Sequence, residues 1–353
     1  MKLIIQIPCF DEEHTLPETL SDLPREIAGI DEVEWLVVDD GSTDRTIEVA
    51  RAGGVQHIVR LTNNKGLAAA FQAGLDASLK LGADIIVNTD ADNQYDGRDI
   101  PKLVAPILAG DADMVIGDRE TDHVEDFSPL KKRLQRWGSA VVRRASNTNV
   151  PDTTSGFRAY NREAALQMQV VSKFTYTLES IIQAGKMLVA VDHVPIRTNA
   201  KTRESRLFPA MWAYVRRNTV SIFRIYTLYE PLRVFLAVAA AFALIGAVIW
   251  ARFLWFYLFS DEPGQHLQSL ILGSTLFIVA VQLAALGVVG DILAGSRLVQ
   301  QRILERVRRV ELHLGVEPSH YEPGAEPTGQ EATTGARSGR ATGKTEEREA
   351  LKL

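Results

Sequence analysis

Short apolar runs alternate with amphipathic stretches over roughly the first 200 residues. Four apolar runs have the length of buried strands, at residues 3–7, 34–38, 84–88 and 113–116. The stretches 42–52 and 65–81 have helical spacing, and Ser42 or Thr43 is the expected N-cap of the first. This alternation predicts an α/β domain with a mostly parallel sheet flanked by helices.

Two longer apolar runs follow, at residues 234–251 and 270–290, against the ~20 apolar residues that span a bilayer. They predict transmembrane helices at about 234–258 and 268–292; the alternative is a hairpin buried in a soluble protein. The link around Asp261 and Glu262 contains no Lys or Arg. Arginines lie on both sides of the two runs in the sequence: Arg216, Arg217, Arg224 and Arg233 precede the first run, and Arg297, Arg302, Arg306, Arg308 and Arg309 follow the second. The positive-inside bias therefore predicts a multi-pass cell-membrane protein with its N-terminal domain and C-terminal tail in the cytoplasm.

These patterns divide the chain into five regions. We expect a globular domain at 1–205, an amphipathic helix in the membrane interface at 206–233, and two membrane helices within 234–294. The apolar side chains along one face of this amphipathic helix could equally pack on the globular domain. A basic juxtamembrane helix at 295–314 and a disordered tail at 315–353 complete the layout, because the tail has few large apolar residues to offset ordering.

Composition narrows the functional classes. The net charge of −5 gives no global electrostatic reason to expect nucleic acid as a partner. The single cysteine, Cys9, cannot form an internal disulfide, which fits a reduced cytoplasmic domain, and we expect it to be buried. The first apolar run is too short for a signal-peptide core.

The richest polar cluster follows the third apolar run, at residues 88–94. Asp90 and Asp92 lie two residues apart, and the amide of Gln94 comes next. Such oxygen ligands suit Mg²⁺ or Mn²⁺ and leave coordination positions for the diphosphate of a nucleotide-sugar. An acidic turn after a strand is common, so this pair becomes informative only through its context.

That context is two further acidic strand ends, at residues 7–13 and 35–42. Their carboxylates can accept hydrogen bonds from a base N–H or a ribose hydroxyl at the carboxyl edge of the sheet. Asp39 or Asp40 alone could instead cap the following helix. Three acidic strand ends together favour a nucleotide site.

With these motifs in view, the chain resembles family 2 glycosyltransferases of the dolichol-phosphate mannose synthase and polyprenyl-phosphate glycosyltransferase type. The resemblance extends from residue 3 to about 300 and rests on six ordered motifs at residues 7–12, 37–42, 64–66, 90–94, 154–158 and 204–208. It implies a nucleotide-diphospho-sugar transferase (GT-A, Rossmann-like) fold. It also implies inverting, metal-dependent transfer of one hexose, from GDP-mannose or UDP-glucose, to polyprenyl phosphate.

The resemblance and the strand-end positions assign roles to individual residues. Asp90, Asp92 and Gln94 are the expected metal ligands, with Asp92 counted as catalytic. The expected nucleotide-sugar contacts are Pro8, Phe10, Glu12, Val38, Asp40, Lys65, Asp90 and Ala91. Asp152 is the expected base or orienting group beside the acceptor, or else forms a turn with Thr153 and Thr154. The cations expected to hold the lipid phosphate, each of which could instead be a solvated surface charge, are Arg119, Arg133, Arg158, Arg203 and Arg206.

Several alternatives stay open from the sequence. Relatives often have Gly-Glu-Ser-Lys where residues 203–206 are Arg-Glu-Ser-Arg, which leaves the acceptor geometry there undecided. A neutral hydroxyl on another membrane lipid would need Asp152 as a true base. A non-catalytic nucleotide-sugar sensor or scaffold is the alternative from another class. Homo-oligomers through Gly273, Gly287 and Gly290 are also open.

Overall fold

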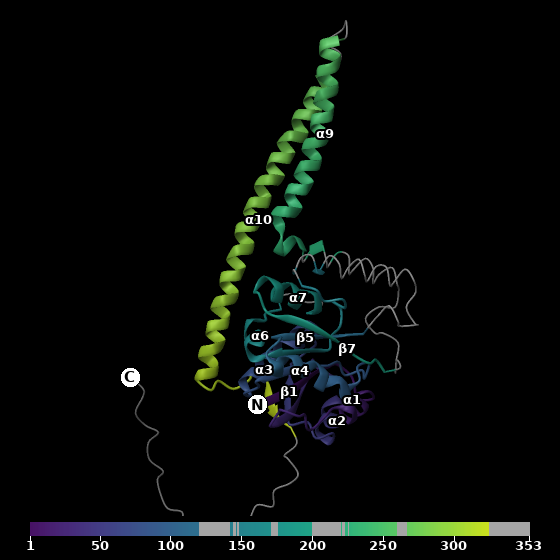
Figure 1. Ribbon diagram of the computed structural model, residues 1–353, viewed down its shortest axis with the longest axis vertical. Coiled ribbons are helices and arrows are strands. Elements are labelled where there is room, and N and C mark those ends of the chain that lie inside the picture. Colours follow the sequence, from purple (N-terminus) through teal and green to yellow (C-terminus); the bar gives the residue numbers. More distant parts are fainter. Residues whose placement is uncertain are drawn as a thin grey trace, which may run out of the picture.

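The computed structural model describes residues 1–119, 142–143, 146, 148–170, 176–199, 220, 223–224, 226–259 and 267–324. These residues form an α/β domain and a long helical hairpin (Figure 1). The sheet has the order β7-β5-β6-β4-β1-β2-β3-β8. Its strands are β1 (Lys2–Cys9), β2 (Glu32–Asp39), β3 (His57–Arg60), β4 (Ile85–Asn88), β5 (Met114–Asp118), β6 (Arg158–Asn161), β7 (Val191–Pro195) and β8 (Tyr321–Pro323).

The four predicted strands are all present, as β1, β2, β4 and β5. Strands β1, β2, β3 and β4 pair in parallel, while β6 runs antiparallel between β4 and β5. This is the expected α/β class with a mixed sheet. Strand β6 contains Arg158 and Asn161, and β3 has only four residues, so neither has the long apolar run that marks a strand in the sequence.

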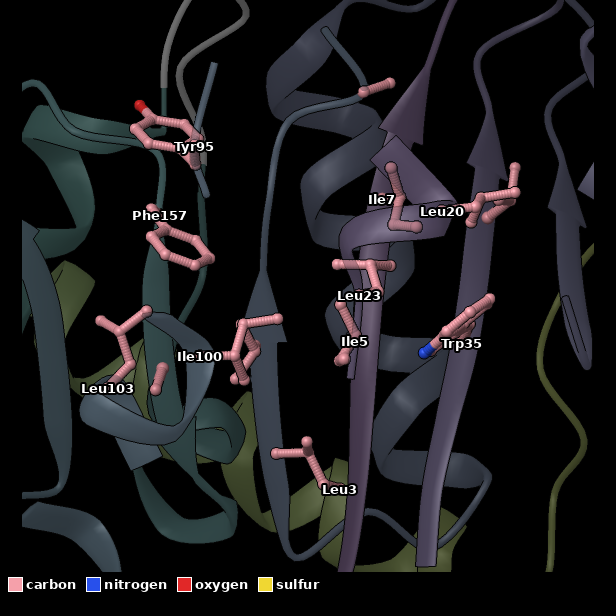
Figure 2. Close-up of a cluster of buried hydrophobic side chains, with 14 of the residues drawn as sticks. Leu3, Ile5, Ile7, Leu20, Leu23, Trp35, Tyr95, Ile100, Leu103 and Phe157 are labelled. Atoms are coloured by element: carbon pink, nitrogen blue, oxygen red, sulfur yellow. The ribbon is translucent and has the colours of Figure 1, made fainter. Parts of the chain in front are cut away.

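Alternate side chains of the strands enter two cores, one on each face of the sheet. Leu3, Ile5 and Ile7 of β1 face one core, and Ile4 faces the other. Figure 2 shows the first core, which is covered by α1 (Leu16–Asp22), α2 (Thr46–Ala52) and α4 (Ile100–Ala109). The second lies under α3 (Leu67–Lys80), α6 (Arg162–Gln167) and α7 (Thr177–Lys186). Both faces are therefore buried, as the continuous apolar strands require.

Helix α2 begins at Thr46, and neither Ser42 nor Thr43 caps it. The Asp44 carboxylate accepts the hydrogen bond from the Thr46 amide, at 3.0 Å. Ser42 instead accepts from the Asp11 amide at 3.0 Å, and the Thr43 amide donates to the Asp11 carboxylate at 2.8 Å. The predicted cap was wrong because these residues join the first two strand ends to each other.

The hairpin consists of α9 (Pro231–Phe259) and α10 (Leu267–His313), both long and apolar enough to cross a membrane. Only 11% of the most apolar 18-residue stretch of each helix is buried, unlike a hairpin in the core of a soluble protein. Gly273 and Gly290 of α10 lie against Trp250 and Pro231 of α9, where an added Cβ would come within 2.2 Å and 2.8 Å. These glycines thus serve packing within the hairpin.

Two predicted boundaries need correction. The basic helix expected at 295–314 is the continuation of α10. The tail was expected to be disordered from residue 315, but β8 pairs antiparallel with β3. Edge pairing uses backbone groups, with Arg60 N donating to His320 O and Gly324 N to Gln56 O, both at 2.9 Å, so a segment poor in apolar residues can join the sheet. Residues 325–353 and most of the 206–233 segment lie outside the described residues.

Gly41 provides a test of the turn after β2. Its φ is +77°, and an added Cβ would lie 2.7 Å from the Asn63 carbonyl carbon; Gly110 has φ +78° with nothing within 4 Å. Both Gly→Ala changes carry left-handed strain of ~1–2 kcal/mol, and Gly41→Ala adds overpacking of ~1–3 kcal/mol. Thermal unfolding of the detergent-solubilised variants should show the larger loss for Gly41→Ala. Equal losses would contradict the close approach.

Candidate active site

The three acidic strand ends meet at one edge of the sheet. Strand β1 lies between β2 and β4 and is parallel to both, so residues that follow the three strands emerge side by side. The Asp40 amide donates to Cys9 O at 2.9 Å, and the Glu12 amide donates to Thr46 Oγ1 at 2.8 Å. The edge predicted from the sequence is therefore assembled by direct hydrogen bonds between its loops.

Asp40 connects the end of β2 to the loop before α3. Its two carboxylate oxygens accept the backbone amides of Lys65 and Gly66, at 2.7 Å and 2.8 Å. Burial raises the pKa of Asp40, although both hydrogen bonds favour its charged form. Gly66 has φ +94°, a conformation that glycine adopts without strain. Asp40 thus positions Lys65, and its own contact with a nucleotide stays a prediction.

The other expected nucleotide-sugar residues differ in access. Phe10 is 38% exposed at the rim. Pro8 and Ala91 are buried, and Val38 is fully enclosed in the core, so its side chain does not reach the edge. Glu12 is 8% exposed and accepts from Thr15 Oγ1 at 2.6 Å. Phe10 therefore offers the most accessible surface of these five.

The loop after β4 carries the expected metal ligands. Burial, and then the neighbouring Asp92 carboxylate, raise the pKa of Asp90 to about 7. Gln94 Nε2 donates to Asp92 Oδ2 at 2.8 Å, so ligation through the Gln94 oxygen stays a prediction. Within the described residues, no cluster of three His, Cys, Asp or Glu side chains could hold a metal. Two mutually repelling carboxylates at the carboxyl edge of the parallel strands fit a Mg²⁺ or Mn²⁺ ion that completes its shell with phosphate oxygens.

Asn88, whose role the sequence analysis missed, supports this loop from below. Its Nδ2 donates to Gly156 O and to Tyr176 Oη, both at 2.9 Å, and its Oδ1 accepts from Gln6 Nε2 at 2.8 Å. Tyr95 Oη accepts from the Gly156 amide at 2.9 Å. The sequence signal was a buried amide ending an otherwise apolar strand. This network fixes the acidic loop relative to the segment at 153–158.

Gly156 permits that close approach. An added Cβ would lie 2.7 Å from Tyr176 Oη and 3.0 Å from Asp90 Oδ2. A side chain at this position would therefore collide with Asp90 in the loop after β4.

Asp152 and Arg119 form a two-point ion pair beside the loop. Arg119 Nε and Nη2 lie 2.7 Å and 3.1 Å from the two Asp152 oxygens, and Nη2 also donates to Thr154 Oγ1 at 2.8 Å. Asp152 is buried, yet Arg119 and Thr154 hold the pKa of Asp152 below its usual value. A carboxylate stabilised in this way is a weak base, which favours the orienting role. Arg119 also opposes the rise in the pKa of Asp90, so it lies within electrostatic reach of the metal loop.

The structure contradicts the expected lipid-phosphate role of Arg158. Its side chain is 0% exposed, and its guanidinium donates to Ser155 O, Thr153 O, Thr177 O and Ser180 Oγ at 2.6–3.1 Å. A buried guanidinium with these bonds cannot reach a lipid phosphate. It instead fixes the 153–158 segment onto α7. Arg133, Arg203 and Arg206 lie outside the described residues, so their roles stay predictions.

The segment after β7 also contacts the metal loop, which the sequence analysis missed. Arg197 pairs with Asp99 at 2.7 Å and with Asp96 at 3.2 Å. The Asn199 amide donates to Gln94 O, and Asn199 Nδ2 to Asn93 O, both at 3.0 Å. Residues 197–199 are thus attached to the segment at 93–99.

The sequence is similar to those of known proteins. The profile of glycosyl transferase family 2 matches residues 4–168. The dolichyl-phosphate hexose transferase of Haloferax volcanii is 31% identical over 211 residues, which are 59% of this chain and 87% of that protein. The chain belongs to glycosyl transferase family 2. It is therefore a glycosyltransferase, and the expected GT-A fold is confirmed.

Other similarities cover the same domain. The undecaprenyl-phosphate mannosyltransferase of Micrococcus luteus is 28% identical over 206 residues, 56% of this chain and 83% of that protein. Among solved structures, glucosyl-3-phosphoglycerate synthase from Mycobacterium tuberculosis matches with a TM-score of 0.49 and 20% identity, over 64% of this chain and 79% of that one.

Arg158→Lys tests the revised role of Arg158. Lysine keeps the charge but lacks the planar fork, and leaves buried carbonyl groups unpaired, so we expect a loss of about 3 kcal/mol in unfolding free energy. Arg98→Lys, at an arginine that is 65% exposed, should change stability little. If Arg158→Lys unfolds like the wild type but weakens lipid-phosphate binding, the original assignment would be restored.

Proposed function

We propose that the protein transfers one hexose from a nucleoside-diphosphate sugar to a polyprenyl phosphate at the cytoplasmic face of a membrane. The observation that carries this proposal is the convergence of the Asp90/Asp92 pair and the Arg119–Asp152 pair on the 153–158 segment. This site belongs to a family 2 glycosyltransferase chain that continues into two apolar helices of membrane length. The two relatives described above are named for dolichyl and undecaprenyl phosphate.

The donor is expected to bind along the acidic edge, with its diphosphate beside Asp90 and Asp92. These carboxylates would hold Mg²⁺ or Mn²⁺, which when bound offsets the negative charge that the departing nucleoside diphosphate acquires. Phe10 offers an apolar surface to the nucleoside, and Lys65, fixed by Asp40, adds a cation. Either GDP-mannose or UDP-glucose is compatible with these groups.

The chemistry of the acceptor agrees with the state of Asp152. A lipid phosphate oxygen is already anionic near neutral pH, so it needs little help from a base. That oxygen attacks the anomeric carbon while the bond to the donor diphosphate breaks on the opposite face, and the configuration inverts. Asp152, with its lowered pKa, orients Arg119 toward the acceptor phosphate instead of accepting a proton.

The membrane arrangement follows from charge. Arginines concentrate in the segments just before and just after the two apolar stretches, and the described ones include Arg224, Arg233, Arg297, Arg302 and Arg306. By the positive-inside bias, both flanks and the α/β domain are cytoplasmic. The donor and the phosphate end of the lipid would then meet on the same side.

A transfer assay tests the reaction. Purified protein in detergent receives radiolabelled GDP-mannose or UDP-glucose, a polyprenyl phosphate, and Mn²⁺ or EDTA. We expect a metal-dependent lipid-linked product, reduced about 100-fold or more by Asp92→Ala and unchanged by Asp111→Ala, whose side chain is exposed. Metal-dependent donor binding without transfer to any lipid phosphate would support the sensor or lipid-hydroxyl alternatives.

Asp152→Asn separates the two acceptor chemistries. For an anionic phosphate acceptor, we expect a partial loss of about tenfold, mainly in the KM for the lipid, because Arg119 loses its orienting partner. Steady-state kinetics at varied acceptor concentration give the split between KM and kcat. A loss of about 1,000-fold or more in kcat would instead indicate a neutral hydroxyl acceptor that needs a base.

A further inference from the structure

Helix α10 is much longer than a membrane crossing needs. Its 47 residues correspond to a length of about 70 Å, more than twice the ~30 Å hydrocarbon core. The apolar part ends near Gly290, and the next 23 residues, from Asp291 to His313, continue the same helix for about 35 Å. Figure 1 shows this part running alongside the α/β domain, past α7 and α6, before the chain turns back.

The far part of α10 is attached to the domain by a buried arginine. Arg308 is 8% exposed, and its Nη1 donates to Leu166 O of α6 at 3.1 Å and to Met168 O, directly after α6, at 2.7 Å. Burial lowers the pKa of Arg308, and the carboxylates of Asp76, at 3.9 Å, and Glu311 partly offset this. Glu311 on the next turn pairs with Lys80 of α3 at 3.2 Å. This attachment is buried and polar, unlike a loose surface contact.

A second attachment lies where the domain enters the hairpin. Glu230, directly before α9, forms an ion pair with Lys186 of α7. Tyr229 packs against the core under α3, α6 and α7. Burial raises the pKa of Tyr229 to about 12, and the side chains of Gln183 of α7 and Gln301 of α10 lie near enough to oppose this rise. Tyr229 therefore lies close to α10 as well as to the start of α9.

The third attachment is β8. After α10 the chain returns to the sheet, where β8 extends β3. His57 Nδ1 lies 2.9 Å from Tyr321 Oη, and Arg51 donates to Glu322 at 2.8 Å. The three attachments contact α7, α6 and the β3 edge, which are separate parts of the domain.

We infer that the part of α10 beyond the membrane, residues 291–313, acts with β8 as a strut that holds the active site at a set height and orientation relative to the bilayer. The inference rests on the proposed function, because it requires an acceptor phosphate in the membrane surface. A domain held at one point would sample many orientations, most of which keep the acidic edge from that phosphate. Three separated attachments to continuous helices remove this freedom before substrate binds. Arg308 is a positioning residue in this scheme and does not touch the reacting atoms.

The experiment compares two acceptors in the full-length protein. One is undecaprenyl phosphate in nanodiscs of phosphatidylcholine and phosphatidylglycerol, and the other is the short, water-soluble citronellyl phosphate. Radiolabelled GDP-mannose and UDP-glucose are supplied in parallel. For Arg308→Met, we expect transfer to the nanodisc acceptor to fall about tenfold or more, while transfer to citronellyl phosphate changes less than about twofold. Arg306→Met, at an exposed position two residues earlier, should leave both rates unchanged.

A second pair of variants keeps every attachment in place. Residues 294–296 lie between the membrane part and the domain, and an added Cβ at Gly295 would meet nothing within 4 Å. The wild-type sequence there is Ala-Gly-Ser. Ala294→Gly with Ser296→Gly makes all three residues glycine and softens the helix relative to Gly295→Ala with Ser296→Ala, which makes all three alanine. We expect the same selective loss for the Gly-Gly-Gly variant and none for the Ala-Ala-Ala variant.

The outcomes are distinguishable. Equal loss with both acceptors would mean that Arg308 and the linker act on the stability of the domain, and would overturn the strut. Faster hydrogen exchange in β8 or α10 would show that Arg308→Met or the Gly-Gly-Gly variant has loosened the strut. If transfer to the nanodisc acceptor were nevertheless unchanged in both variants, the strut would also be overturned. Failure of the wild type with both acceptors would refute the proposed function itself.

Discussion

The hydrogen bonds of the Asn88 amide are the interaction on which the site depends. Asn88 ends β4, accepts from Gln6 of β1, and donates to Gly156 and Tyr176. It thereby joins the central strands to the segment that carries Asp152 and to α7. All of these groups are buried, so an unpaired partner would lose its hydrogen bond without gaining one to water. Together with Tyr95, this side chain holds the loop at Asp90 against the segment that follows Asp152.

Charge is distributed around that network in two ways. Arg158 and Asp152 are both buried, but Arg158 bonds mainly to carbonyl oxygens, whereas Asp152 shares a fork with a partly exposed Arg119. The Arg158 guanidinium therefore stabilises the fold and is not available to a ligand. The second arrangement leaves an oriented cation at the edge. Asp90 has no such partner within hydrogen-bonding distance among the described residues, and burial and Asp92 raise its pKa to about 7. A divalent cation bound there would stabilise the carboxylate.

The membrane hairpin and the catalytic domain form one structural unit. Close packing of α9 against α10 at Gly273 and Gly290 keeps the two helices together, and α10 then continues beside α6 and α3. A lipid acceptor cannot turn freely in three dimensions as a soluble substrate does. Its phosphate stays near the membrane surface, so the enzyme must supply the correct height and angle. We infer that the continuous helix α10, with its attachments to the domain, provides this placement.

Local pattern was sufficient for much of this molecule. The apolar runs determined β1, β2, β4 and β5 and the two long helices, because burial on both faces of a sheet, or in lipid, requires such runs. The acidic strand ends located the edge, because parallel strands end together. Only the tertiary structure showed that Arg158 is buried and that Arg119 pairs with Asp152. It also showed that Ser42 accepts a hydrogen bond from the loop after β1, and that β8 pairs with β3 at the edge of the sheet. Each of these depends on which backbone carbonyls, carboxylates or sheet edges lie within about 3 Å, as a hydrogen bond requires, and residues distant in the sequence supply them.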